Sequence, residues 1–188
     1  MPKVKVGDKI TELSLPMLDG KRFEINQLAG KRYLLSFHRF ASCPFCNLRI
    51  HQLTQQADTW PQQFTVVAIF DSTLADLQAS SEKHQAPFYI LADQTNQYYR
   101  QFAVERSWLK TLKGGLIRLP QLCYAMFVKG YFPWKISGKL HTMPLDILVD
   151  EAGVVVEVHY GQDEGDHIEI TRINQFAIGV GSGATQSV

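Results

Sequence analysis

The feature that most constrains this fold is an apolar run that leads into a helical pattern carrying two cysteines. Residues 33–37 (YLLSF) are almost wholly apolar, which is typical of a strand covered on both faces of a sheet. From Cys43 onward, apolar residues recur every three or four positions, at Cys46, Ile50, Leu53, Ala57 and Trp60. This spacing predicts a helix that ends near Pro61. A buried strand that feeds a helix indicates a layered α/β domain.

The rest of the chain continues this alternation of strands and helices. Asp19-Gly20 favours a tight turn, so residues 13–18 and 23–25 are expected to form an N-terminal hairpin. The remaining expected strands are Phe64–Phe70, 88–91, Leu145–Val149 and 154–160, with helices over 73–84 and around Ile170, Ile173, Phe176 and Ala177. The order predicts an α/β sandwich with one sheet.

Length and composition fit a single globular domain. The chain has 188 residues, of which 45% are hydrophobic and 20% charged, and no apolar run approaches the ~20 residues of a membrane span. We expect residues 1–178 to form one domain and residues 179–188, which are glycine-rich and polar, to form a flexible tail. The start of the chain lacks the apolar stretch of a signal peptide, so the expected compartment is the cytoplasm.

One insert, residues 104–141, has a strongly biased charge. It contains seven basic residues and one acid, Glu105, hence a net charge of +6 in a chain whose total is +1. The segment is also rich in aromatic and aliphatic residues, which predicts two short amphipathic helices with their apolar side chains in the core. The small total charge predicts no binding of nucleic acid. Contact with an anionic membrane is not expected, and self-association through the insert remains an alternative.

The two cysteines of Cys43-Pro44-Phe45-Cys46 are the candidate catalytic residues. With Cys43 at the N-cap and Pro44 in the first turn, free amides and the positive helix end point at the first sulfur, which stabilises a thiolate. We therefore expect Cys43 to be an exposed nucleophile and Cys46, one turn further on, to be a buried resolving thiol. Arg39 and Arg49 are candidates for electrostatic support.

Zinc binding and a structural disulfide account for the two cysteines less well. A zinc site needs two further ligands, but the third cysteine, Cys123, lies far away and no second paired motif follows. A structural disulfide is uncommon in the expected compartment, and inert core thiols have no reason to occupy a helix end. Cys123 lies in an apolar run and is expected to be a buried spectator rather than a resolving thiol. The six histidines are scattered and are interpreted as ordinary core or surface residues.

Several short motifs carry a resemblance to a known family. They are Lys5-Val6-Gly7-Asp8, Asp19-Gly20-Lys21 and Leu28-Ala29-Gly30-Lys31 before the apolar run, and then the strand-to-helix cysteine pair. This sequence resembles the AhpC/TSA peroxiredoxin-like branch of the thioredoxin fold. Met143-Pro144 before residues 145–153 resembles the segment where thioredoxin-fold proteins place a cis-proline. Residues 160–163 and 165–167 resemble a sub-branch with a basic, aromatic insert, so the likeness covers about residues 4–178.

The resemblance implies a thioredoxin-like fold: a central mixed β-sheet flanked by helices, with an N-terminal β-hairpin and the helical basic insert 104–141 before the candidate cis-proline. Met143 and Pro144 would then shape a groove for substrate. The peroxiredoxin motif Pro-x-x-x-Thr-x-x-Cys fits neither register. Counting back from Cys46 places Cys43 and Arg39 at its threonine and proline positions. Either sulfur thus remains a candidate for the attacking group, and the chemistry of the helix end favours Cys43.

The resulting hypothesis is a thiol-disulfide oxidoreductase, a peroxiredoxin-like antioxidant protein that reduces hydroperoxides or protein disulfides through its cysteine pair. Cys43 would form a sulfenate or mixed disulfide, which Cys46 would resolve. No metal and no cofactor beyond the redox-active pair is expected. The expected reductant is of thioredoxin, glutaredoxin or glutathione type, and a homodimer is an open alternative. The competing hypothesis is a non-enzymatic binding or scaffold protein that contacts a partner or an anionic membrane through the insert.

Overall fold

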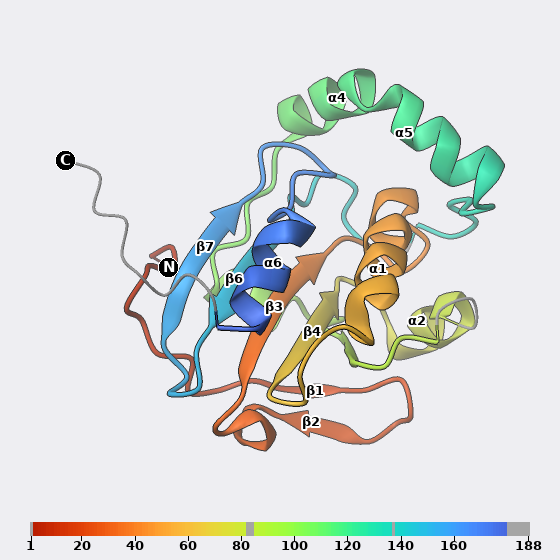
Figure 1. The fold of residues 1–188 in the computed structure, drawn as a ribbon. Coiled ribbons are helices and arrows are strands. Elements are labelled where there is room, and N and C mark those ends of the chain that lie inside the picture. Colours follow the sequence, from red (N-terminus) through yellow and green to blue (C-terminus); the bar gives the residue numbers. More distant parts are fainter. Residues whose placement is uncertain (1, 82–84, 137, 180–188) are drawn as a thin grey trace.

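A five-stranded mixed sheet forms the centre of the molecule (Figure 1). The computed structural model describes residues 2–81, 85–136 and 138–179. The strand order is β5-β4-β3-β6-β7. Strands β3 (Arg32–His38), β4 (Phe64–Phe70) and β5 (Tyr89–Ala92) run parallel, whereas β6 (Leu145–Val149) and β7 (Val155–Tyr160) are antiparallel to their neighbours. The predicted mixed sheet is therefore confirmed.

Three helices cover one face of the sheet: α1 (Pro44–Ala57), α2 (Leu74–Ser81) and α6 (Ile170–Ala177). Side chains alternate between the two faces of a strand, so the even-numbered residues of β3 and β4 point toward these helices. Leu34 and Val66 pack there with Leu53 of α1 and with Ile173 and Phe176 of α6. On β3 the next even-numbered residue is Ser36, which is polar and also fully buried. The polar groups of the site thus begin on this face.

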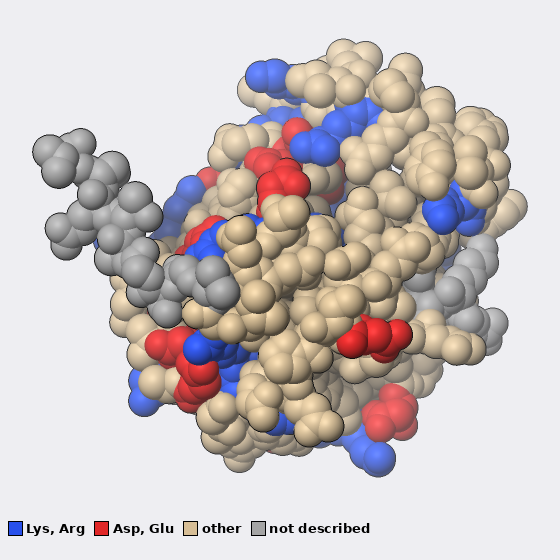
Figure 2. All heavy atoms as spheres, in the orientation of Figure 1, with Lys and Arg blue, Asp and Glu red and all other residues tan. Residues whose placement is uncertain are grey.

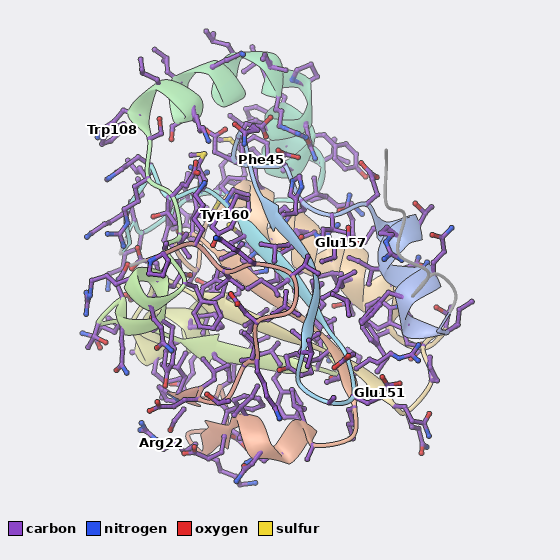
Figure 3. All side chains as sticks on the ribbon, turned by 90° about the vertical axis from the view of Figure 1, so that its left-hand side faces the viewer. Arg22, Phe45, Trp108, Glu151, Glu157 and Tyr160 are labelled. Carbon is purple, nitrogen blue, oxygen red and sulfur yellow. The ribbon has the colours of Figure 1, made fainter. Side chains whose placement is uncertain are left out.

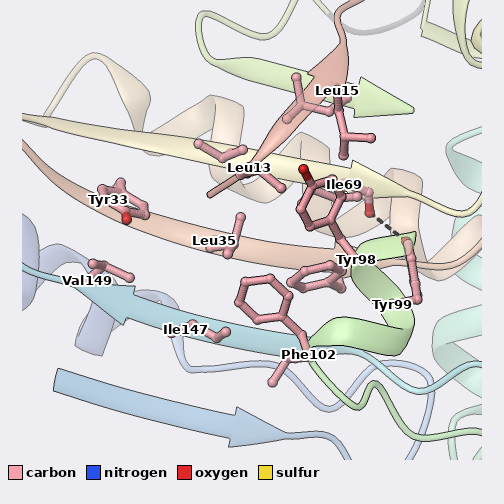
Figure 4. Packing of buried hydrophobic residues seen from close by; sticks show 14 of the residues in the cluster. Leu13, Leu15, Tyr33, Leu35, Ile69, Tyr98, Tyr99, Phe102, Ile147 and Val149 are labelled. Atoms are coloured by element: carbon pink, nitrogen blue, oxygen red, sulfur yellow. Dashed lines mark hydrogen bonds between the residues drawn. The ribbon is translucent and has the colours of Figure 1, made fainter. Parts of the chain in front are cut away.

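The other face is covered by a hairpin and a short helix. Strands β1 (Ser14–Pro16) and β2 (Arg22–Glu24) pair antiparallel around Gly20, whose φ of +81° requires a left-handed turn that glycine adopts at little cost. A 3-10 turn, η1 (Ile25–Leu28), follows. Figure 4 shows Tyr98 and Phe102, at helix α3 (Gln97–Gln101), packed over the sheet near Leu35 and Ile147. The predicted hairpin is confirmed, whereas α3 was not predicted.

The insert forms an arch over the end of the sheet that lies near the start of α1 (Figure 1). It consists of α4 (Trp108–Ile117), α5 (Leu119–Cys123) and a π-helical turn, η2 (Tyr124–Val128), so the prediction of short helices is confirmed. The prediction that its apolar side chains are core is wrong, because Leu109 is 83% and Trp134 81% exposed. Cys123 is also exposed rather than buried. In α4 the cause is that the helix packs on the body through Gly114, which leaves its large apolar side chains outside.

Two further predictions concern the ends of elements. Residues 180–188 of the predicted flexible tail lie outside the described residues, as do residues 82–84 at the end of the predicted second helix. Among the described residues, no helix is long and apolar enough to cross a membrane.

The predicted cis-proline is wrong. The described residues contain no cis peptide bond, and the bond before Pro144 is trans. The Met143 amide donates to the Glu105 carbonyl at 2.8 Å, and the Pro144 carbonyl accepts from the Gly161 amide at 2.9 Å. Both hydrogen bonds continue the extended backbone of β6, which a trans bond accommodates.

Candidate active site

Cys43 and Cys46 lie at the N-terminus of α1, as the sequence predicts. Cys43 is the N-cap residue with an extended backbone, and Pro44 occupies the first turn, where its missing N–H costs no hydrogen bond. The expected exposure of Cys43 is wrong, because it is 0% exposed and Cys46 is 2% exposed. The segment after η2 covers them. The Ser42 hydroxyl donates to the Lys135 carbonyl at 2.5 Å, and the Arg39 guanidinium donates to the Leu140 carbonyl at 2.7 Å.

Arg39 contacts both sulfur atoms. Its Nη2 donates to Cys43 Sγ at 3.2 Å, and its backbone N–H donates to Cys46 Sγ at 3.3 Å. Burial disfavours the charged guanidinium, but the Cys43 thiolate and the Glu164 carboxylate beside it outweigh burial and raise the pKa of Arg39. Arg39 therefore carries a permanent positive charge beside the cysteine pair. The structure brings this predicted residue to Cys43.

The same contacts separate the acidities of the two thiols. Burial opposes ionisation of Cys43, but a hydrogen bond from the Cys46 thiol and the charge of Arg39 lower the pKa of Cys43 to about 5. Burial and the hydrogen bond to Cys43 together raise the pKa of Cys46. At neutral pH, Cys43 is a thiolate and Cys46 a protonated donor. The two thiols thus differ in acidity in the order that the predicted nucleophile and resolving thiol require, although both sulfur atoms are buried.

Glu164 is a residue of the site that sequence reasoning missed. It lies in the loop after β7, is 3% exposed, and places Oε1 3.9 Å from Arg39 Nη1. Burial raises the pKa of Glu164, and the charge of Cys43 raises it further. Its Oε2 has no hydrogen-bond partner among the described residues. One guanidinium is therefore shared by the Cys43 thiolate and the Glu164 carboxyl group.

Gly114 of α4 sits directly on this carboxyl group. A Cβ atom at Gly114 would lie 2.0 Å from Glu164 Oε2, so the close approach of α4 requires glycine. Arg118, at the end of α4, forms an ion pair with the neighbouring Asp163. The insert is thus fixed to the loop that carries Glu164. No local pattern in the sequence indicates this contact, because the two segments lie far apart along the chain.

A second buried polar cluster lies beside the cysteines. Asp146 of β6 faces Ser36 across the strand pair and accepts a hydrogen bond from its hydroxyl at 2.5 Å. His167 contacts both Asp146 oxygens at 3.1 Å, and the Ile168 amide donates to Asp146 at 3.0 Å. Burial opposes the charge, but His167, the nearby Arg49 and Ser36 lower the pKa of Asp146 well below its ordinary value. Asp146 therefore anchors the loop that carries Glu164.

Arg49 belongs to this second cluster rather than to the sulfur site. Its guanidinium donates to the Ile168 carbonyl at 2.6 Å and lies 3.4 Å from Asp146. The structure thus does not bring the predicted Arg49 to the cysteines, because a residue three positions after Cys46 projects toward β6. Met143 and Pro144 lie just before β6 and are buried, so they line no exposed groove in this conformation.

His38, interpreted from the sequence as an ordinary core or surface residue, is buried and belongs to this second cluster. Its Nε2 lies 3.1 Å from the Ser36 hydroxyl, and its ring stacks on Phe70 with a centroid distance of 4.9 Å. Burial, with the nearby charge of His167, lowers its pKa well below the ordinary value. His38 is therefore neutral. Its Nδ1 has no hydrogen-bond partner among the described residues.

A cavity of about 190 Å³ opens beside the residue before Cys43. It lies between α1, α2 and the insert, and its lining is Ala41, Ser42, Asn47, Asp76, Ala79, Ser80, Tyr131, Phe132, Trp134 and Lys135. Figure 3 shows Phe45, from the cysteine motif, beneath the insert. The described residues contain no group of three His, Cys, Asp or Glu side chains placed to hold a metal ion. The geometry therefore offers thiol chemistry with a covered approach.

Comparison with solved structures supports the fold. Peroxidoxin BcpB from Mycobacterium tuberculosis superposes with a TM-score of 0.66 at 16% identity, over 93% of this chain and 97% of that protein. Thiol peroxidase from Chromobacterium violaceum superposes with a TM-score of 0.63 at 15% identity, over 93% of this chain and 87% of that protein. At these identities the likeness concerns the fold, and it confirms the predicted thioredoxin-like architecture.

Comparison of sequences identifies the family. Peroxiredoxin Bcp of Escherichia coli (strain K12) is 28% identical over 122 residues, which cover 63% of this chain and 78% of that protein. Residues 6–158 match the AhpC/TSA family over most of the chain, including the cysteine pair, Arg39 and Asp146. The resemblance seen in the sequence motifs is therefore confirmed, and this chain belongs to the AhpC/TSA family.

Proposed function

We propose that this protein is a thiol peroxidase in which Cys43 attacks the hydroperoxide and Cys46 resolves the product. The relatives are peroxiredoxins, which are thiol-based oxidoreductases. The observation that carries the assignment to Cys43 is the contact of its sulfur with the Arg39 guanidinium at 3.2 Å, together with the hydrogen bond from Cys46. Nucleophilic attack requires the thiolate, and only Cys43 of the pair is ionised at neutral pH.

The first step forms a sulfur–oxygen bond and breaks the oxygen–oxygen bond. The Cys43 thiolate attacks the terminal oxygen of the hydroperoxide, and the alkoxide or hydroxide that leaves takes up a proton. Cys43 becomes a sulfenic acid, so the sulfur loses two electrons and the hydroperoxide gains them. Arg39, which already contacts Cys43, stabilises the negative charge that is redistributed during this displacement.

The second step converts the sulfenic acid to a disulfide. The Cys46 thiol loses its proton and attacks Cys43 sulfur, and the sulfenic oxygen leaves as water. The product is a Cys43–Cys46 disulfide, which two reducing equivalents convert back to the dithiol. A disulfide substrate would enter the same cycle through a mixed disulfide at Cys43. The cysteine pair would be the redox group, and the cycle requires no added cofactor.

The reductant and the compartment follow from the same chemistry. The relatives imply hydroperoxide or disulfide substrates and a thioredoxin-type reductant, and we propose a thioredoxin, a glutaredoxin or glutathione. The three cysteines lie in the described part of the chain and all are free thiols there, which fits the reducing cytoplasm. Both reacting thiols belong to one chain, so the cycle would run in a monomer or in a homodimer.

Cysteine variants test this assignment. We expect Cys43→Ser to abolish hydroperoxide consumption with a thiol reductant, and Cys46→Ser to complete the first step and accumulate sulfenic acid at Cys43. Cys123→Ser is the matched control, since Cys123 is exposed on the insert, and it should retain the full rate. Mass spectrometry after one equivalent of peroxide should detect a Cys43–Cys46 link. Full peroxidase activity in Cys43→Ser would refute the assignment and leave Cys46 as the attacking thiol.

A further inference from the structure

The outer face of α4 is apolar, which reverses the usual arrangement of a surface helix. Surface helices direct their apolar stripe toward the core. In α4 the large apolar side chains Trp108, Leu109, Leu112 and Leu116 face solvent, whereas Gly114 packs against the body. Figure 3 shows Trp108 at the start of α4, where its ring stacks on His141 with a centroid distance of 4.8 Å and remains 62% exposed. The helix is therefore amphipathic with its apolar face uncovered.

Further exposed apolar residues follow α4 along the insert. Phe127 and Val128 of η2 are exposed, and Trp134 and Ile136 extend the surface toward the sulfur site. Among the described residues, the exposed large apolar side chains outside the insert are Val6 and Ile178. Large exposed apolar side chains that gather in one segment in this way indicate an interaction site, whereas isolated ones are ordinary.

Basic residues border this surface, and acidic residues are absent from it. Residues 106–139 contain no Asp or Glu, although they contain seven Lys and Arg residues. Lys110 pairs with Glu105 at the start of the insert, and Arg118 and Lys135 pair with Asp163 and Asp76 outside it. Within the described part of the chain, the side-chain ammonium groups of Lys113 and Lys139 form no ion pair with a carboxylate. In Figure 2 the part of the surface over α4 and α5 is tan and blue, with red below it.

We propose that the outer face of the insert binds the surface of an anionic lipid bilayer. Leucine and phenylalanine side chains would enter the boundary between headgroups and acyl chains, with Trp108 and Trp134 near its polar side. Lys113 and Lys139 would lie against anionic headgroups, which supply the negative charge that the face lacks. The arch of α4 and α5 is convex, so it presents a ridge rather than a groove to its partner (Figure 1).

A second copy of the chain fits this face less well. A two-fold dimer brings the same patch of each subunit together, so basic residues would face basic residues with no acid of residues 106–139 to balance them. A bilayer provides both the apolar layer and the opposite charge. Binding in this orientation places the end of the sheet that carries the cysteines toward the membrane, and it does not depend on which thiol reacts.

Sedimentation with vesicles tests the apolar part of the proposal. We expect the full chain to sediment with vesicles of phosphatidylcholine and phosphatidylglycerol, more weakly with phosphatidylcholine alone, and less as salt is added. The double variant Leu109→Glu/Leu116→Glu should lower the partition constant at least ~10-fold, because two side chains leave the apolar layer. The matched control Val6→Glu/Ile178→Glu changes exposed apolar residues outside the insert and should sediment like the parent. All four positions are exposed, and circular dichroism verifies the fold.

Charge and fluorescence provide independent measurements. Lys113→Gln/Lys139→Gln should weaken binding to anionic vesicles and leave the weak binding to neutral ones unchanged. In a Trp60→Phe background, the emission of Trp108 and Trp134 should shift to shorter wavelength when vesicles are added. Equal sedimentation of the double-glutamate variant and its control would overturn the proposal. A parent chain that does not sediment with vesicles would also overturn it. If light scattering then shows a dimer that the two glutamates dissociate, the face binds a second copy; if the chain stays monomeric, the face has neither occupant.

Discussion

Replacing Arg39 by methionine tests the central electrostatic argument. Arg39 supplies the positive charge at the site and one hydrogen bond to Cys43 Sγ, at 3.2 Å. Methionine keeps an unbranched, apolar side chain of similar reach, so the change removes charge and hydrogen bonding with little loss of volume. Glu164 loses its cation in the same variant, and burial, which raises the pKa of Glu164, then favours its neutral form.

The expected shift follows from the geometry. The pKa of Cys43 lies at about 5 against an ordinary value of 9.0, a difference that corresponds to ~5 kcal/mol. A unit charge 3.2 Å away contributes ~5 kcal/mol at an effective dielectric constant of ~20. The hydrogen bond from Cys46 lowers the pKa of Cys43 further, and burial raises it, so these two effects oppose each other. We expect Arg39→Met to raise the pKa of Cys43 by at least ~2 units.

The assay is the ultraviolet absorbance of the thiolate as a function of pH, followed by the initial rate of hydroperoxide reduction. At about pH 6 the ionised fraction of Cys43 should fall from about nine-tenths to about one-tenth, and the rate should fall with it and recover as the pH rises. Arg39→Lys keeps the charge and should shift the midpoint less. Arg22→Met, at an exposed site, is the control. A folded Arg39→Met protein with an unchanged midpoint would refute the reasoning.

Three other changes have expected outcomes. Cys46→Ser weakens the hydrogen bond to Cys43 and should raise the pKa of Cys43 in the same absorbance titration; a lower midpoint would contradict this role of Cys46. Glu164→Gln removes a charge that competes for the shared guanidinium and should lower the pKa of Cys43. The control is Asp163→Asn, at the preceding residue, whose carboxylate pairs with Arg118 instead; equal shifts in both variants would argue against sharing. Asp146→Asn should lower the free energy of unfolding by about 3 kcal/mol at neutral pH, measured by urea denaturation. Folding lowers the pKa of Asp146, so the stability that the carboxylate contributes is present above the unfolded pKa of 3.8 and is lost as the pH falls below that value. The free energies of unfolding of the parent and the variant should therefore converge in acid. A constant difference down to the acid limit would contradict the burial of a charged Asp146.

The central sheet could be predicted because its strands carry their signal locally. The buried runs at β3 and β4 are apolar on both faces, and the hairpin turn at Asp19-Gly20 has a strong local preference. Helix α3 was missed because a single helical turn contains too few residues to establish a period. Its tyrosines are held by distant partners, as when the Tyr99 hydroxyl donates to the Ile69 carbonyl at 2.9 Å.

In the site, too, the features that depend on neighbouring residues could be predicted, and those that depend on distant residues could not. The position of Cys43 at a helix end follows from residues next to it, but its burial depends on carbonyl groups of Lys135 and Leu140, about ninety residues later. Glu164 reaches Arg39 only through the fold, so the sequence offers no spacing from which to predict it. In the insert, periodicity predicted helices correctly, but a period does not determine which side of a helix meets the body.

The hydrogen bonds to the Lys135 and Leu140 carbonyls hold the segment that covers Cys43, and this cover affects the hydroperoxide and the reductant differently. A hydroperoxide needs a smaller opening to reach Cys43, which is 0% exposed, than a protein reductant that has to contact the sulfur directly. Releasing both contacts costs about 2 kcal/mol, and the hydrogen bond from the Lys139 amide to Asp71 adds to this cost, so only a small fraction of molecules is uncovered at any time. Recycling is therefore expected to reach a plateau with increasing reductant protein while oxidation continues to accelerate with peroxide. Under abundant peroxide the enzyme would then accumulate in its disulfide form.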